Sequence, residues 1–343
     1  MTNNRIYSLD WLKGWMIICI VCYHSYFFPG FRGYLAVDLF FFISGYLLMQ
    51  SFLHKPKTAV QYTWKRIQQL AAPYFICLFL AICLRRSAFT DVSSFGAWTD
   101  LISKALSSAS FADEFGAELT RSPFLLGGWF LSVLVIGSFL LYGALQFNER
   151  LATTVLFPLV VLFGYNALLG HAESVNNFAR IGLLGAPMIR GVFEMAAGVL
   201  IGHLVVHHKA GLEKRSLLIN IFGVVSFIVF MALMFTKNAL DKYLIITIPW
   251  IITASVIDGS WLNTALLKLN GGVIARLGRY SLYVYCIHGI AQTIVFAIND
   301  QILHHAWGDT TVFFVYLATV AIASLAIYYL SQFITRRIKN RED

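Results

Sequence analysis

The stretch YLAVDLFFFISGYLLMQSFL, residues 34–53, decides the fold because it is almost entirely apolar and holds one charged residue, Asp38. An α-helix of about 20 residues crosses the hydrocarbon core of a bilayer, which is about 30 Å thick. The stretch has this length, and its Ser44 and Gly45 are small residues that permit close helix approach in a membrane. It therefore predicts a transmembrane helix.

The composition extends this prediction to the whole chain. Of its 343 residues, 58% are hydrophobic and 13% are charged, whereas an average soluble domain has about 25% charged residues. The net charge of +9 would also suit a nucleic-acid-binding protein, but the charges fall between apolar runs of about 17 to 23 residues. The placement of the charges excludes a nucleic-acid partner and predicts an all-α, polytopic integral membrane protein.

The apolar runs predict about ten transmembrane helices in one integral domain, residues 1–343, with no separate soluble domain. An even number of spans puts both termini on one side of the membrane, and 17 of the 26 Lys and Arg residues fall on that side. Because cytoplasmic loops carry the excess of basic residues, both termini are expected in the cytoplasm. The expected spans lie near 13–28, 34–53, 70–84, 124–146, 151–169, 188–206, 216–235, 243–259, 279–298 and 311–333.

The longest loop, residues 85–123, is predicted on the outer side and holds five of the 17 acidic residues. Two interpretations remain open for it. It covers an external substrate, or it is a solvated connector without a role in binding.

Two polar residues at membrane depth are candidates for catalysis. His24 follows Lys13 by eleven residues on the first predicted helix, which places it about 16 Å deeper and past the middle of the bilayer. Asp38 opens the second helix, one short outer loop away. An aspartate beside an imidazole fixes its tautomer and raises its basicity, as a general base requires. Alternatively, His24 hydrogen-bonds a backbone carbonyl and Asp38 caps its helix; both interpretations remain open.

The ninth and sixth predicted helices hold the other ionisable groups at depth. His288 follows Arg279 by nine residues, so it lies about 14 Å from the cytoplasmic edge, at a depth similar to that of His24. The tyrosines that precede it would supply hydroxyls to a wet cavity, although a buried structural histidine is an equal alternative. Arg190 and Glu194 are four residues apart, and we expect them to form a structural ion pair.

No metal site is expected. His203, His207 and His208 include the i, i+4 spacing of zinc ligands, but neither Cys nor a carboxylate stands near them in the sequence. Cys19 and Cys22 form a C-x-x-C pattern on a helix at lipid depth, without a second pair.

Several segments together resemble one family. The segment RIYSLDWLKGWMIICIVCYH, residues 5–24, is similar to the first helix of the membrane-bound acyltransferase 3 family, in which a basic residue, ten intervening positions and a histidine recur. AVDLFFFISGYLL resembles the second-helix signature of that family. Further matches follow in chain order and extend the resemblance over nearly the whole sequence: WKRIQQLAAPYF, GGWFLSVL, FEMAAGVLIG and LGRYSLYVYCIHG.

The resemblance implies transfer of an acyl group, usually acetyl, from cytoplasmic acyl-CoA to a hydroxyl of a glycan or lipid-linked sugar at the outer face. It implies that Lys13 takes the basic site, His24 the place of the catalytic histidine, and Arg66 the first place of a basic pair near the coenzyme. Lys13 stands where arginine is commoner, and Gln69 replaces the second arginine of the pair. A multi-pass protein of the bacterial inner membrane is expected.

The candidate residues fall into three groups. His24 and Asp38 are expected to be catalytic, with His24 acting either as a general base or as a transient acyl carrier. The coenzyme phosphates of acetyl-CoA are expected to meet Lys13, Lys65, Arg66 and Arg279. Candidates for the substrate cavity are Trp129, Ser132, Tyr283, His288 and Glu194.

Two other classes of function remain as alternatives. A transporter or flippase of a lipid-linked sugar also needs polar groups at depth, but such proteins tend to show paired, Gly- or Pro-interrupted helices in two halves, and this sequence does not. A non-catalytic sensor or assembly factor would not need His24 and Asp38 at these positions. Membrane lipids surround the chain in every case, and the sequence leaves the acceptor and the oligomeric state open.

Overall fold

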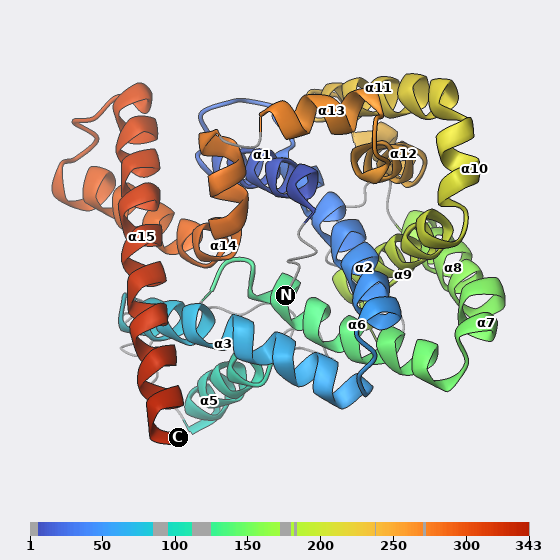
Figure 1. The fold of residues 1–343 in the computed structure, drawn as a ribbon. Helices are drawn as coiled ribbons and strands as arrows, with labels where there is room; N and C mark the ends of the chain where they lie inside the picture. Colours follow the sequence, from blue (N-terminus) through green and yellow to red (C-terminus); the bar gives the residue numbers. More distant parts are fainter. Residues whose placement is uncertain are drawn as a thin grey trace.

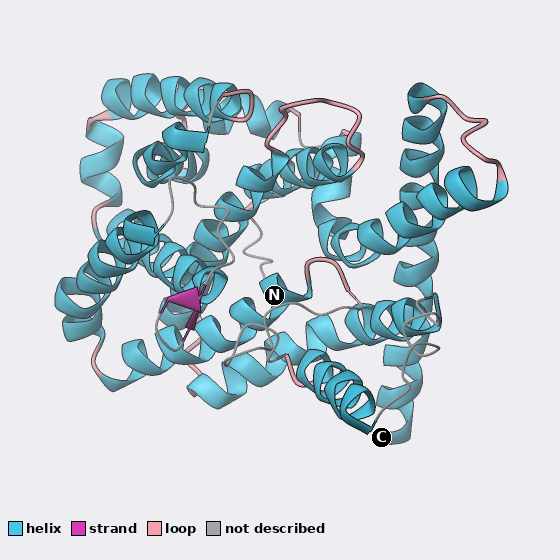
Figure 2. Cartoon of the chain, turned by 180° about the vertical axis from the view of Figure 1, so that it is seen from behind, coloured by secondary structure: helices cyan, strands magenta, loops and turns pink. Residues whose placement is uncertain are grey.

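The protein is built almost entirely of helices, as the ribbon in Figure 1 shows. The computed structural model describes residues 6–84, 95–111, 125–171, 180–181, 184–236, 238–269 and 272–342. Within them two short strands, β1 (Arg180–Ile181) and β2 (Leu184–Gly185), pair antiparallel (Figure 2). The α-helices are α1 (Tyr7–His24), α2 (Ala36–His54), α3 (Ala59–Leu84), α5 (Phe95–Ala109), α6 (Gly128–Phe147), α7 (Glu149–Leu151), α8 (Phe157–His171), α9 (Ala186–His207), α10 (Lys209–Lys214), α11 (Ser216–Leu233), α12 (Leu244–Val256), α13 (Trp261–Lys268), α14 (Val273–Ala297) and α15 (Asp309–Glu342).

The all-α, multi-pass architecture expected from the sequence is confirmed. Within the described residues, eight helices are long and apolar enough to cross a membrane, or nine if α12 and α13, bent by 65° at their junction, form one span. The sequence predicts ten. The remaining predicted span, the first along the chain, corresponds to α1, which is not among these candidate spans. Asp10, Lys13 and His24 lower the mean hydropathy of this 18-residue helix. More than half of α1 is buried, because it packs against other helices of the bundle.

Two helix boundaries differ from the prediction in ways that matter for the site. The third predicted span begins near residue 70, whereas α3 begins at Ala59, so Lys65 and Arg66 lie on the helix and not on a loop before it. The first span was expected to reach residue 28, but α1 ends at His24. Tyr26 and Gly30 both have positive φ angles, which an α-helix does not accommodate.

Two pairs of helices form the centre of the bundle, α1 with α14 and α2 with α9. Gly14 of α1 faces the backbone of Ile274 and Gly278, and Gly45 of α2 faces the carbonyl of Met195 on α9. A side chain at either glycine would overlap backbone atoms of the partner helix, so these glycines permit the close approach. Gly14 lies against Gly278, and ten residues further along each helix His24 lies against His288. The two helices therefore run parallel.

The long loop 85–123 is described only in part. Helix α5 lies within it and is tied to α3, because the Tyr74 hydroxyl donates a hydrogen bond to the carbonyl of Ser108 at 2.7 Å. Residues 85–94 and 112–124 lie outside the described residues. A role for this loop in covering a substrate stays a prediction.

The distribution of basic residues gives a test of orientation. A phosphatase that is active only outside the cytoplasm, fused after Asp343, is expected to be inactive, because 17 of the 26 basic residues lie on the side of the termini. The same phosphatase inserted in the loop 85–123 should be active. An active fusion at Asp343 would reverse the orientation and place Lys13 at the outer face.

Candidate active site

The parallel crossing of α1 and α14 brings two histidines together. The rings of His24 and His288 lie 4.9 Å apart, centroid to centroid, and are tilted by 44°. His288 is fully buried and His24 is half-buried. The side-chain amide of Gln292 on α14 donates a hydrogen bond to the backbone carbonyl of His24 at 2.7 Å, which holds the end of α1 in place. The similar depth that the spacing predicts for the two histidines agrees with this contact.

The orientation of the His288 ring is fixed from its own helix. Its Nδ1 lies 2.6 Å from the carbonyl oxygen of Tyr285. Because a carbonyl only accepts hydrogen bonds, Nδ1 carries the proton and donates it, and Nε2 of the neutral ring is left as an acceptor. A second imidazole at 4.9 Å, that of His24, therefore stands beside a ring whose tautomer is set.

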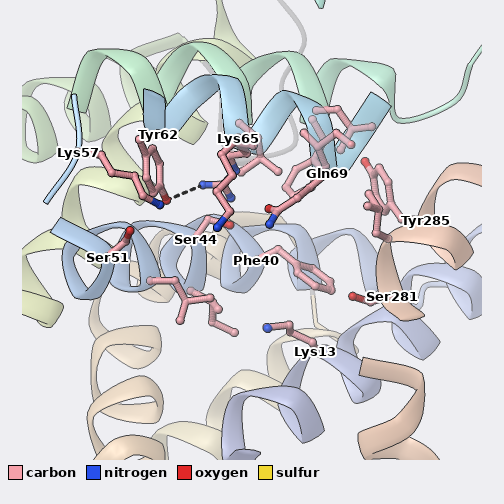
Figure 3. A pocket seen from close by; sticks show the side chains of 18 of the residues that line it. Lys13, Phe40, Ser44, Ser51, Lys57, Tyr62, Lys65, Gln69, Ser281 and Tyr285 are labelled. Carbon is pink, nitrogen blue, oxygen red and sulfur yellow. Dashed lines mark hydrogen bonds between the residues drawn. The ribbon is translucent and has the colours of Figure 1, made fainter. Parts of the chain in front are cut away.

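A cavity of about 510 Å³ opens between α1, α2, α3, α6 and α14. Figure 3 shows Lys65 and Gln69 entering it from α3, with Lys13 and Ser281 on the opposite side. Five basic side chains line it, and none of the described lining residues is acidic. The basic residues are Lys13, Lys55, Lys57, Lys65 and Arg66, and the large apolar ones are Phe40, Ile43, Leu47, Leu70, Phe130, Leu131, Leu134 and Leu282.

Helix α6 holds the basic part of this cavity in place. The Tyr142 hydroxyl accepts a hydrogen bond from the backbone N–H of Lys57 at 3.0 Å, and the Gln146 side chain accepts one from Ala59 at 2.8 Å. These bonds anchor the turn between α2 and α3. Arg66 is fixed separately, because its Nη1 donates to the Ser138 hydroxyl at 3.0 Å. The turn that carries Lys57 and the side chain of Arg66 are thus held by neutral partners on α6.

The cavity carries positive charge that these partners do not neutralise. Burial lowers the pKa of the Lys57 ammonium, and the charges of Lys65 and Lys55 lower it further. Lys13 has a carboxylate partner, since its Nζ lies 3.5 Å from Asp10. The net charge of the lining side chains is still positive, so the cavity would favour a ligand with several negative charges.

Tyr285 connects the cavity to the histidine pair. It lines the cavity, and its ring lies 5.4 Å from that of His288. Its hydroxyl donates a hydrogen bond to the carbonyl of Gly127 at 3.2 Å, at the start of α6. Neither His24 nor His288 lines the cavity, so Tyr285 is the lining residue whose ring contacts the histidine pair.

Asp38 has a different partner from the one expected. Its Oδ1 accepts a hydrogen bond from Nε of Arg190 at 2.6 Å and lies 2.5 Å from the Nη2 of the same guanidinium. No hydrogen bond or ion pair joins Asp38 to His24 among the described residues. The register of α2 against α9 causes this, because it places Asp38 opposite Arg190. The expected pair of Arg190 and Glu194 is present at 3.5 Å, so one guanidinium faces two carboxylates.

The remaining predicted residues lie apart from the cavity. Arg279 is exposed on α14 and is not among the lining residues. The Ser132 hydroxyl donates to the carbonyl of Gly128 in its own helix at 3.3 Å. Trp129 packs against Phe41, and Tyr283 packs against tyrosines of α14 and α15.

Among the lining residues that sequence reasoning did not assign to the site are Lys55, Lys57 and Tyr62. Lys55 and Lys57 flank Pro56 in a short turn on the side with excess basic residues. An excess of basic residues in a loop is typical of the cytoplasmic side of membrane proteins in general, so these two lysines did not indicate a binding site.

The comparison with protein families agrees with this architecture. A family model described as an acyltransferase domain matches residues 6–329, nearly the whole chain. No curated protein and no solved structure gives a match. The match includes every residue of the basic cavity and of the histidine pair. The chain therefore belongs to the membrane-bound acyltransferase 3 family, and its activity is acyl transfer within a membrane.

Proposed function

We propose that the protein transfers an acetyl group from cytoplasmic acetyl-CoA to a hydroxyl of a cell-surface or lipid-linked glycan at the outer face of the bacterial inner membrane. The observation that carries this proposal is the basic cavity of about 510 Å³ that Tyr285 lines, with the Tyr285 ring 5.4 Å from that of His288. Its volume lies in the range of small-molecule sites. Five cations without a lining carboxylate favour the phosphates of a coenzyme A ester.

The donor and the acceptor reach the centre from opposite sides in this proposal. Lys13, Lys65 and Arg66 hold the phosphates, and the apolar walls at Phe40 and Phe130 accommodate the less polar arm. His24 lies at the end of α1 that is predicted to face outward, where an acceptor hydroxyl can approach it. His288, oriented by the carbonyl of Tyr285, supports the His24 ring from α14.

The reaction requires one proton transfer to the leaving group. His24 removes the proton of the acceptor hydroxyl as its oxygen bonds to the acyl carbon, and the carbon–sulfur bond of the thioester breaks. The histidine then returns the proton to the departing thiolate. The products are an O-acetyl ester and free coenzyme A. If an acyl-histidine intermediate forms, the same overall reaction proceeds in two steps: the acyl group moves first from coenzyme A to the histidine and then from the histidine to the acceptor hydroxyl.

Inverted membrane vesicles test the proposal, because they present the cytoplasmic face to the medium. Vesicles with the protein, given acetyl-CoA labelled in the acetyl group, are expected to label a glycan or lipid-linked sugar fraction. The label should be released by mild base, as an ester is. Sealed vesicles of the opposite orientation should not incorporate label. Equal labelling in vesicles without the protein would contradict the proposal.

Loss of one cavity cation is expected to weaken donor binding. Lys65→Ala and Arg66→Ala should each raise the KM for acetyl-CoA about tenfold, because a hydrogen bond to a charged group contributes roughly 1.5–3 kcal/mol and each 1.4 kcal/mol is a factor of ten. The KM for the acceptor should stay unchanged. Lys214→Ala is the matched control, since Lys214 is exposed on α10 and does not line the cavity. If the KM for acetyl-CoA is unchanged in both cavity variants, Lys65 and Arg66 do not bind the donor and serve only to orient the protein in the membrane.

A further inference from the structure

A cluster of potential metal ligands lies outside the acyl-transfer site. Glu149 begins α7, and His203 and His207 lie one turn apart near the end of α9. One ligand atom from each of the three lies within 4.8 Å of the others. The sequence gives no hint of the carboxylate, because Glu149 is far from the two histidines along the chain. Helix α8, which follows α7 along the chain, packs against α9 and so brings Glu149 close to both histidines.

The distances fit a bound ion better than direct hydrogen bonds. The Oε1 of Glu149 lies 3.6 Å from Nδ1 of His203 and 3.7 Å from Nε2 of His207. Both distances are too long for hydrogen bonds. Zinc bonds of about 2.0–2.1 Å at tetrahedral angles separate neighbouring ligand atoms by about 3.3 Å. The two distances to the Glu149 oxygen are within a few tenths of an ångström of this value, and the two histidine nitrogens lie within 4.8 Å of each other, so a side-chain adjustment would place all three atoms around one ion.

The state of His203 supports the same interpretation. Its Nδ1 is buried and has no hydrogen-bond partner among the described residues, which is costly for a polar atom. The rings of His203 and His207 are 4.3 Å apart and present their nitrogens to the same carboxylate oxygen. A cation between them would satisfy the lone pairs of both rings and the charge of Glu149.

We propose that Glu149, His203 and His207 bind one divalent transition-metal ion, with Zn²⁺ as the best match to two imidazoles and a carboxylate. Water fills the fourth position. The ion joins α9 to α7, which follows the end of α6 where Gln146 and Tyr142 anchor the turn that carries Lys57. It would thus stabilise the framework beneath the basic cavity without contacting the reacting groups.

Metal binding is measured on the full-length protein, purified in detergent with any affinity tag removed and treated with a chelator. Titration with Zn²⁺ against a competing indicator dye is expected to show one saturable site. Co²⁺ should give the intense visible absorption of a tetrahedral centre. Zn²⁺ should also raise the midpoint of thermal unfolding, because it binds the folded state.

Substitutions assign the site. Glu149→Gln and His207→Ala should each weaken Zn²⁺ binding by more than about 100-fold, since even outer-shell partners of a metal contribute 10–100-fold. Glu213→Gln and His54→Ala are the matched controls, because both residues are exposed at the ends of nearby helices and lie outside the cluster. They should bind Zn²⁺ like the wild type.

Two results would overturn the proposal. One is the absence of saturable binding, which would make the cluster an ion pair that forms only when the histidines are protonated. The other is binding that the Glu149 and His207 substitutions leave unchanged, which would place the ion elsewhere. Neither measurement uses acetyl transfer, so failure of the metal site is distinguishable from failure of the proposed function.

Discussion

His24→Ala is expected to abolish acyl transfer, with turnover lowered by about 10²- to 10⁴-fold, the usual contribution of a general base. The imidazole lies at the end of α1, beside the ring of His288. Water can replace a base at an exposed site, but His24 is half-buried within the bundle. The measurement is acetyl transfer in inverted vesicles, with protein levels matched by immunoblot.

The substitution should leave the protein folded, because alanine fits a helix and introduces no polar group into the membrane. His54→Ala is a control, since His54 is exposed at the end of α2 and bonds only within its own helix. His288→Ala tests the alternative assignment. If His24→Ala retains near-normal turnover while His288→Ala is inactive, the catalytic base lies on α14.

Much of this site follows from helix geometry alone. A rise of about 1.5 Å per residue places His24 and His288 at similar depths, and the two rings are in contact. The basic residues in the first halves of α1 and α3 were also identified from the sequence, and Lys13, Lys65 and Arg66 all line the cavity. Depth along a helix is a local property, so one sequence is sufficient to predict it.

Partners across helices were harder to predict. Asp38 was expected beside His24, but it pairs with Arg190, because Gly45 and Gly198 set how α2 and α9 pack. Glu149 was not considered with His203 and His207, although it lies against both. These pairings depend on which faces of distant helices meet, and hydropathy does not contain that information.

The buried group of Asp38, Arg190 and Glu194 joins α2 to α9, and each of the three residues is at most 3% exposed. One guanidinium faces two carboxylates, with 2.5 Å to Asp38 and 3.5 Å to Glu194. The cation is therefore the central member. A buried carboxylate without a partner is far less stable in a low-dielectric interior than in water.

Arg190→Met is consequently expected to destabilise the protein by about 3–5 kcal/mol, the usual effect of removing one partner from a buried ion pair. Methionine has a similar length, so the loss reflects charge more than volume. The midpoint of thermal unfolding in detergent should fall by on the order of 10 °C. The triple variant with Asp38→Asn and Glu194→Gln should recover most of this loss, because it leaves no unpaired charge. A midpoint in Arg190→Met equal to that of the wild type would show that the two carboxylates are already neutral, and that the guanidinium does not hold α2 and α9 together.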